Sequence, residues 1–356
     1  MSDITKQLQE QIATAISEKK SLNIVGGNSK SFYGRSTECE SLVMRPHTGI
    51  VNYEPTELVM TVRAGTSLRE IEEELKNNNQ MLPFEPPHYG PDATIGGTIA
   101  CNLSGPRRAY AGAARDYVLG TKIINGNVEV LHFGGVVMKN VAGYDVSRLM
   151  TGAMGTLGVL LEISFKVLPR FASEMTLVQE MNVGDAIIKM NQWAGKPNPL
   201  SATAYVDGKL FVRLSGADSA LQAARQRIGG ELLPDAESFW LRLKEQQLPA
   251  FDNAQTIWRI SVPQTTPPLA LDGEQLIEWG GGLRWLIGNE NPDRIRETVS
   301  KVGGHATLFK CGDNDLNQDQ EIFHALDKGL VKLHHNLKKS FDPHLVFNPN
   351  RMFRNL

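Results

Sequence analysis

The chain has 356 residues, of which 41% are hydrophobic and 21% are charged, and its formal net charge is −2. This composition is ordinary for a globular protein large enough for two domains. Because the net charge is close to zero, the chain has no basic field that attracts nucleic acid or an anionic membrane surface, and both classes of partner are disfavoured.

The three cysteines, Cys39, Cys101 and Cys311, are isolated in the sequence and show no C-x-x-C spacing. We therefore expect no zinc site, no iron–sulfur cluster and no other metal site in this chain. An odd number of separate thiols fits a reducing cytoplasm. No apolar run approaches the roughly 20 residues that span a bilayer, so we expect a cytoplasmic protein.

The first elements are a helix, a strand and a loop. Apolar side chains at Ile4, Leu8, Ile12 and Ile16 predict an amphipathic helix over residues 3–19. Residues 21–25 then read as a short strand, which leads into a glycine-containing loop. This loop comprises Gly26, Gly27, Asn28, Ser29, Lys30 and Ser31.

The loop over residues 26–31 has two explanations. Its backbone N–H groups can point in one direction and bind a pyrophosphate, with Lys30 as an added cation, or the residues can form a plain turn. The loop alone leaves both open. It is neither a Walker A loop nor a G-x-G-x-x-G fingerprint, which disfavours a P-loop NTPase and a Rossmann fold.

Residues 58–64 have strand-like content, and Ser67 with Glu70 has the capping-box spacing that begins a helix. A proline-rich extended loop follows at residues 83–89. His88 lies in this loop, and a single loop histidine is more often incidental than catalytic.

Two further glycine groups follow. The first includes the candidate binding residues Thr94, Ile95, Gly96, Gly97, Asn102, Ser104, Gly105 and Arg108, and the second comprises Gly155, Thr156, Gly158 and Val159. Glycines this frequent require a reason, either positive φ or close approach of the backbone to a large flat ligand. A loop-rich β domain that uses glycine only for turns is the alternative. Arg107, Arg108 and Arg115 can meet a phosphate or a carboxylate, or can be solvated surface arginines.

The Asn125-Gly126 pair predicts a hairpin, and alternating apolar residues from Val159 to Val167 predict a long strand with one buried face. We place the main domain boundary after this strand. The second half alternates strands at 174–181, 201–214, 256–262, 283–287 and 306–310 with helices at 185–194, 217–228 and 292–302. This order predicts an α+β domain of ferredoxin-like units.

Residues 318–339 are expected to form a long helix with leucines along one side, followed by a tail that contains Phe341-Asp342-Pro343 and Asn348-Pro349. His334 and His335 are consecutive in this helix and point about 100° apart, so they cannot chelate a metal together. His324 has better spacing with Lys328, but a solvated helix face explains both residues.

Five segments in the same order resemble the vanillyl-alcohol oxidase / p-cresol methylhydroxylase (PCMH) family. They are the motif at 93–97, Asn-Leu-Ser-Gly at 102–105, Arg-Asp-Tyr-Val-Leu-Gly at 115–120, Lys-Asn-Val-Ala-Gly-Tyr-Asp at 139–145 and Gly-Thr-Leu-Gly at 155–158. The resemblance implies an α+β fold with a two-subdomain FAD-binding domain over 1–170, a ferredoxin-like cap domain over 171–340 and a tail at 341–356 that returns to the FAD domain. It assigns the three glycine groups to FAD. The loop at 26–31 holds no histidine or cysteine for a covalent link, so the FAD is expected to be noncovalent.

Within the family the likeness is to a subunit of a complex that oxidises glycolate or another 2-hydroxy acid. It implies a catalytic flavoprotein partner, an iron–sulfur partner and membrane association, at the inner membrane, only through these partners. Catalytic relatives carry metal-associated histidines and a Gly-Glu-His-Gly-like segment, which this sequence lacks. His305 has no evident partner. Arg213, Arg259 and Arg284 lie in predicted strands, and the sequence does not show which face of the sheet their side chains occupy.

Three hypotheses follow. The chain is an accessory or electron-relaying FAD subunit, a self-sufficient FAD oxidoreductase of glycolate or D-lactate with an unrecognised base, or a fold that has lost its flavin and serves assembly. The missing base favours the first, since a positioned base contributes about 10² to 10⁴ in rate.

Overall fold

The computed structural model describes residues 2–135, 145–252, 254, 256–311 and 321–354, and it divides into two compact units. Unit 1 takes the described parts of residues 1–103, 113–169 and 325–356, and unit 2 takes those of 104–112 and 170–324. The break after Pro169 lies next to the predicted boundary. Two segments differ from the predicted division, because residues 104–112 group with unit 2 and residues 325–340 group with unit 1.

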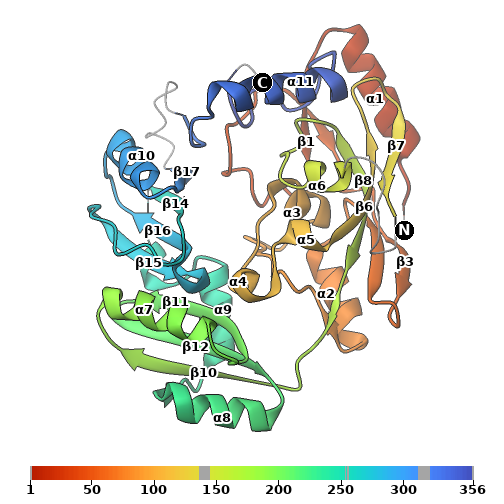
Figure 1. The fold of residues 1–356 in the computed structure, drawn as a ribbon. Helices are drawn as coiled ribbons and strands as arrows, with labels where there is room; N and C mark the ends of the chain where they lie inside the picture. Colours follow the sequence, from red (N-terminus) through yellow and green to blue (C-terminus); the bar gives the residue numbers. More distant parts are fainter. Residues whose placement is uncertain (1, 136–144, 253, 255, 312–320, 355–356) are drawn as a thin grey trace. The chain divides into compact units, whose positions relative to one another are not determined.

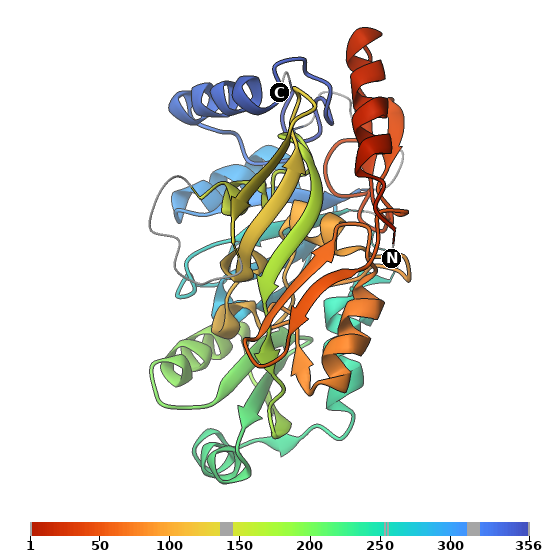
Figure 2. The ribbon, with the colours of Figure 1, turned by 90° about the vertical axis from the view of Figure 1, so that its right-hand side faces the viewer.

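Unit 1 is built on a five-stranded antiparallel sheet in the order β3-β4-β8-β6-β7 (Figure 1). The strands are β3 Ile50–Glu54, β4 Val59–Arg63, β6 Val118–Ile124, β7 Val130–Gly134 and β8 Val159–Lys166. The orange and yellow-green strands run side by side in the second view as well (Figure 2). The predicted hairpin at Asn125 is confirmed, since its side-chain oxygen accepts the N–H groups of Asn127 and Glu129.

Two short strand pairs, one parallel (β1 with β2) and one antiparallel (β5 with β9), and several helices complete unit 1. β1 Leu22–Val25 pairs with β2 Glu40–Val43, and β5 Gln80–Met81 pairs with β9 Leu168–Pro169. The helices are α1 Thr5–Ser17, α2 Leu68–Asn77, α3 Ile95–Cys101, α5 Ala114–Tyr117, α6 Val146–Met150 and α11 Lys328–Phe341. The predicted first helix is confirmed, and its Leu8 and Ile12 are fully buried. The predicted cap of α2 is confirmed, because the Ser67 hydroxyl accepts the N–H of Glu70.

The last helix begins later than predicted. We expected a helix from residue 318, but α11 starts at Lys328, residues 321–327 are not helical, and residues 318–320 lie outside the described residues. The Asp327 carboxylate accepts the N–H of Leu330 and so caps the helix there. Ile322 instead packs in the core of unit 2, and its carbonyl accepts the N–H of Leu308.

Unit 2 is an eight-stranded sheet in the order β13-β10-β12-β11-β15-β16-β14-β17. The strands are β10 Ser173–Glu180, β11 Leu200–Val206, β12 Lys209–Gly216, β13 Glu231–Leu232, β14 Ile257–Ser261, β15 Glu274–Glu278, β16 Leu283–Ile287 and β17 His305–Lys310. The helices are α4 Arg108–Ala111, α7 Val183–Ala194, α8 Asp218–Ile228, α9 Ala236–Lys244 and α10 Pro292–Lys301, with 3-10 turns at Pro249–Phe251 and Trp279–Gly281.

The first half of unit 2 follows the ferredoxin-like order β10-α7-β11-β12-α8-β13. The second half repeats the strand arrangement with β14, β15, β16 and β17, with a loop in place of the first helix. The two halves join where β11 pairs with β15. We did not predict β15, and without it the sheet has no connection between its halves.

Candidate functional site

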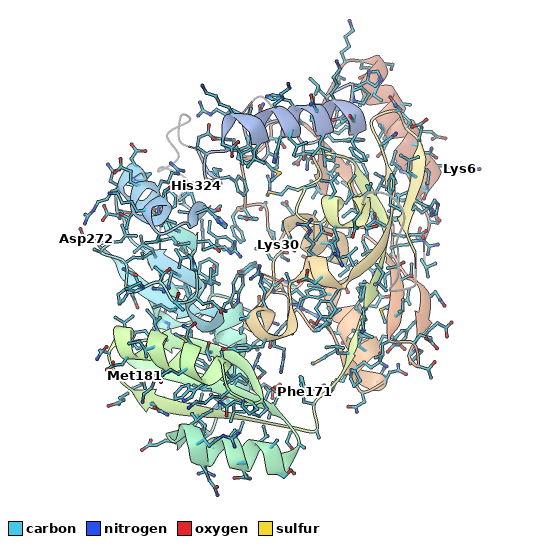
Figure 3. The ribbon with its side chains drawn as sticks, viewed as in Figure 1. Lys6, Lys30, Phe171, Met181, Asp272 and His324 are labelled. Atoms are coloured by element: carbon cyan, nitrogen blue, oxygen red, sulfur yellow. The ribbon has the colours of Figure 1, made fainter. Side chains whose placement is uncertain are left out.

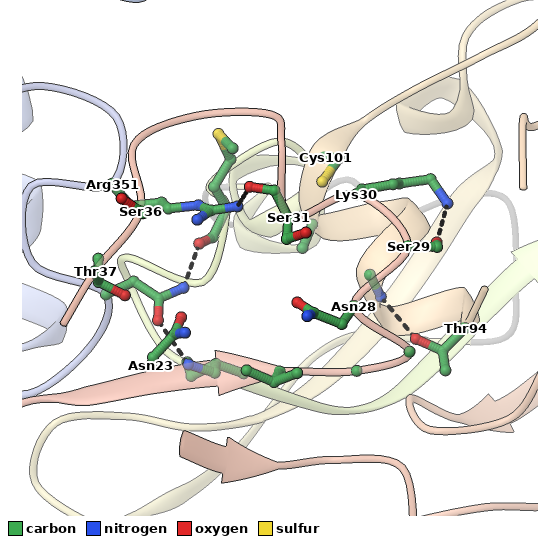
Figure 4. A pocket seen from close by; sticks show the side chains of 18 residues that line it. Asn23, Asn28, Ser29, Lys30, Ser31, Ser36, Thr37, Thr94, Cys101 and Arg351 are labelled. Atoms are coloured by element: carbon green, nitrogen blue, oxygen red, sulfur yellow. Dashed lines mark hydrogen bonds between the residues drawn. The ribbon is translucent and has the colours of Figure 1, made fainter. Parts of the chain in front are cut away.

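One cavity of unit 1 has a volume of about 240 Å³, and we call it the loop cavity (Figure 4). The predicted phosphate loop forms one wall, because every residue from Gly26 to Ser31 lines it. Thr94 and Gly97 line it from the start of α3. The structure thus places the first two predicted glycine groups around one space.

The backbone of the loop is arranged to receive an anion. β1 ends at Val25, and Asn28 then takes a left-handed conformation with φ of 58°. Within the described part of the chain, the backbone N–H groups of Gly26, Gly27, Asn28 and Ser29 donate no hydrogen bond. Consecutive N–H groups in such a turn form a concavity that binds phosphate without a side-chain charge. A plain turn would not require four successive N–H groups without an acceptor.

The charges of the lining also suit an anion. Its charged side chains are Lys30 and Arg351, and the lining contains no aspartate or glutamate. Lys30 is 6% exposed, and its ammonium donates to the His88 carbonyl oxygen. The ammonium also lies 3.4 Å from the Ser29 hydroxyl (Figures 3 and 4). The dinucleotide FAD fits this arrangement, since its pyrophosphate supplies the missing negative charge.

A second, smaller cavity of about 60 Å³ shares walls with the first, and we call it the inner cavity. Gly96, Gly155 and Gly158 line it, together with the shared residues Gly26 and Gly97. The three predicted glycine groups therefore meet at two cavities that share residues.

Several of these glycines are required by the protein's own packing or by a positive φ, and close approach of their backbone to a ligand stays a prediction. A Cβ on Gly27 would overlap the carbonyl oxygen of Asp92, and a Cβ on Gly96 would lie 2.7 Å from the carbonyl oxygen of Ala64. Gly155 has φ of 72°. Gly97 is the exception, because its Cβ would meet only the Thr94 hydroxyl, at 3.4 Å.

Several predicted binding residues line neither cavity. These are Ile95, Asn102, Ser104, Gly105, Arg108, Thr156 and Val159. Ser104, Gly105 and Arg108 belong to unit 2, and Thr156 lines a third cavity of about 180 Å³ in unit 1. The motif at residues 139–144 lies outside the described residues.

Sequence reasoning missed part of the lining. The loop cavity is also lined by Asn23, Ser36, Thr37, Cys101, Met154, Asn348 and Arg351. Asn348 is 4% exposed, accepts the N–H of Ile24 at its side-chain oxygen and donates to the carbonyl oxygen of Met154. The Asn-Pro motif of the tail was the available signal, but it did not indicate which side chain reaches the cavity.

Arg107 and Arg108, which belong to the glycine group that includes residues 94–108, make contacts within unit 2. Arg107 pairs with Glu174 and donates to the Ser215 hydroxyl, at 3.2 Å. The Arg108 guanidinium lies 4.4 Å from the ring centre of Trp279, and Arg259 lies 5.2 Å from the same centre. Arg115, in unit 1, is exposed. A flavin contact of Arg108 remains a prediction.

The histidines we considered have ordinary surroundings. His88 contacts the Glu72 carboxylate at 3.1 Å, His324 lies 3.2 Å from the Ser300 hydroxyl, and His334 packs edge-on against Phe353. Burial lowers the pKa of His305, and the nearby Arg259 and Arg108 lower it further. No group of three metal-ligating side chains occurs among the residues that the structure describes.

Comparison with known proteins identifies the family. Residues 3–148 match the family model described as FAD binding domain. Glycolate oxidase subunit GlcE of Escherichia coli (strain K12) is 49% identical over 354 residues, which is 99% of each chain. The chain belongs to the GlcE family. Glycolate oxidase subunit GlcD of Bacillus subtilis (strain 168) shares 29% identity with this GlcE-family chain over 171 residues, 47% of this chain and 36% of that protein.

Solved structures show the fold. p-Cresol methylhydroxylase with substrate bound has a TM-score of 0.72 at 12% identity and covers 98% of this chain and 87% of its own. An alkyldihydroxyacetonephosphate synthase has a TM-score of 0.66 at 14% identity and covers 97% and 74%. The GlcE-family chain therefore has the α+β, PCMH-type FAD-binding fold. Among its described helices, none has the length and apolar content needed to cross a membrane.

Proposed function

We propose that this protein is the FAD-binding subunit of a complex that oxidises glycolate or a related 2-hydroxy acid. FAD binds to unit 1, and unit 2 is the cap domain. The subunit has an accessory or electron-relaying role beside a GlcD-like catalytic flavoprotein and an iron–sulfur subunit. It resides in the cytoplasm and reaches the inner membrane only through these partners.

The loop cavity is the observation that carries the cofactor assignment. Four successive N–H groups without an acceptor among the described residues, two cations and no lining carboxylate suit a pyrophosphate. The identity of 49% with GlcE over nearly the whole chain supports the role as an oxidase subunit. When bound, FAD supplies a two-electron acceptor that can also pass on single electrons.

We propose noncovalent attachment because the loop at residues 26–31 contains no histidine or cysteine. Cys101 is the thiol of the cavity lining, which makes the proposal testable. Acid precipitation of the purified protein should leave the flavin in the supernatant. Yellow colour retained in the washed pellet would show a covalent link.

The accessory role rests on the missing catalytic base. Removal of hydride from glycolate requires loss of the hydroxyl proton, and no histidine is among the described residues that line the loop cavity or the inner cavity. The purified single chain, loaded with FAD and mixed with glycolate, should show slow or no loss of flavin absorbance. Addition of the partner subunits should then change the redox state of its flavin. Rapid bleaching in the single chain would overturn the accessory role.

A self-sufficient oxidoreductase is the second candidate. It is favoured by the positive charge around Trp279, where Arg108 and Arg259 both contact the indole and both lower the pKa of His305. Such a cluster suits a carboxylate. Turnover of glycolate or D-lactate with an artificial electron acceptor by the single chain would select this candidate.

A further inference from the structure

The C-terminal tail contributes to the loop cavity although it is far from the phosphate loop in sequence. The FAD-binding family model ends at residue 148, whereas Asn348 and Arg351 of the tail line the cavity. The tail lies beside β1, since the N–H of Leu22 donates to Val346 and the N–H of Asn348 donates to Leu22. The tail thereby places Arg351 in the lining of the same cavity as the phosphate loop.

Arg351 holds the segment that follows the loop. Its Nη2 donates to the carbonyl oxygen of Ser31 at 3.1 Å (Figure 4). The same Nη2 donates to the carbonyl oxygen of Tyr33 at 2.8 Å, and Nη1 donates to that of Arg35 at 2.7 Å. Its own carbonyl oxygen accepts the N–H of Arg35. The chain passes so close that a Cβ on Gly34 would lie 3.0 Å from the carbonyl oxygen of Arg351.

The guanidinium of Arg351 lacks a carboxylate partner in the described chain. Its three side-chain hydrogen bonds all go to neutral carbonyl oxygens. Arg351 is half-buried, and this burial lowers the pKa of its guanidinium. A charge in this position is stabilised by an anion, and the loop cavity beside it has room for one.

We propose that Arg351 is the second cation of the pyrophosphate site, acting with Lys30, and that the tail and the phosphate loop bind the cofactor together. The inference rests on the proposed FAD site in the loop cavity. It adds a binding residue more than 200 residues beyond the end of the matched FAD domain. An arginine presents several donors in a fixed plane, so it can bind carbonyl oxygens and a phosphate at once.

The test is FAD affinity of flavin-depleted protein, measured by isothermal titration for the wild type, Arg351→Met and Arg351→Lys. Loss of a charged hydrogen-bond donor to a phosphate should weaken FAD binding about 10- to 100-fold in Arg351→Met, with a smaller loss in Arg351→Lys. The affinity of Arg351→Met should also depend less on salt. Arg63→Met is the matched control, because Arg63 also donates to a carbonyl oxygen, that of Thr48, but does not line the cavity.

The outcomes distinguish failure of the proposed function from failure of the role of Arg351. Failure of the wild type to bind FAD would overturn the proposed function. FAD binding by Arg351→Met within twofold of the wild type would overturn the role of Arg351 alone. If the variants do not fold, the rate of trypsin cleavage after Arg351 is measured in the wild type. FAD should slow this cleavage. Equal cleavage rates with and without FAD would contradict the proposal.

Discussion

The ammonium of Lys338 and the carboxylate of Asp342 lie 2.7 Å apart in the interior of unit 1, and their side chains are 5% and 0% exposed. Lys338 also donates to the carbonyl oxygens of Thr156 and Phe347, and Asp342 accepts the N–H groups of Val346 and Phe347. The pair therefore joins α11, the tail and the third glycine group. These contacts fix the tail that carries Arg351 to the rest of unit 1.

Asp342→Asn should strongly destabilise the protein. It removes the counter-charge of a buried lysine, and breaking such a pair costs about 3–5 kcal/mol in the free energy of unfolding. Chemical denaturation followed by tryptophan fluorescence measures the change. Glu18→Gln is the control, since the Lys20–Glu18 pair is exposed and its loss should change the free energy of unfolding little. A loss below about 1 kcal/mol in Asp342→Asn would show that the pair does not hold the tail.

Gly97 offers a way to block the cofactor without damaging the fold. It lines both cavities, lies within α3, and a Cβ there meets only the Thr94 hydroxyl at 3.4 Å. Gly97→Val should lower the FAD content of purified protein while the melting temperature stays near that of the wild type. Gly96→Ala should instead lower the melting temperature, because its Cβ would lie too close to the backbone of Ala64. Full flavin content in Gly97→Val would show that FAD does not occupy the space beside Gly97 in either cavity.

The sequence predicted the elements whose signals are local. The alternation in β8, the Asn125 turn and the Ser67 cap depend on neighbouring residues and were correct. Contacts between distant residues could not be predicted in the same way. Arg107 and Arg108 adjoin the glycines in sequence, but Arg107 pairs with Glu174, so residues 104–112 group with unit 2.

The same limit applies to the candidate site. The phosphate loop was recognisable because all its residues are consecutive, whereas Arg351 enters the cavity through pairing of the tail with β1. The leucine repeat that suggested a helix from residue 318 did not reveal that Asp327 caps α11 at Lys328. The reason for each glycine also depends on residues far away, as with Gly27 and Asp92.

Cys101 should report whether the loop cavity is filled. It lines the cavity, and burial raises the pKa of its thiol, although Lys30 and Arg351 oppose this effect. In a Cys39→Ser, Cys311→Ser background, Cys101 should react slowly with N-ethylmaleimide at neutral pH, and saturating FAD should slow the reaction further. Mass spectrometry gives the rates. The same rate with and without FAD would place the cofactor away from this wall of the cavity.

His47 should make the stability of unit 1 depend on pH. Its side chain is 0% exposed, and its Nδ1 accepts the N–H of Ile4 at 3.2 Å, which requires the neutral ring. Burial lowers the pKa of His47 below its usual value of 6.5. Arg63 and Lys122 lower this pKa as well, while Asp3 and Glu162 raise it.

The direction of the effect follows from the lowered pKa. Between the native pKa and 6.5 the unfolded chain binds more protons at His47 than the folded chain does. The contribution of His47 to the free energy of unfolding should therefore be fully present above pH 6.5 and should decrease as the pH falls below 6.5. Burial also lowers the pKa values of His305, His324 and His334, which add slopes of the same sign. His47→Asn, which keeps an acceptor but does not titrate, should therefore reduce the slope between pH 7 and 5 without abolishing it. Asp3, whose pKa is lowered to about 2 mainly by the Thr5 hydroxyl, itself titrates below this range. Because its carboxylate raises the pKa of His47, Asp3→Asn should lower that pKa further and should not reduce the slope. Urea denaturation at a series of pH values tests both variants, and an identical slope in His47→Asn and the wild type would show that His47 is not a source of the acid sensitivity.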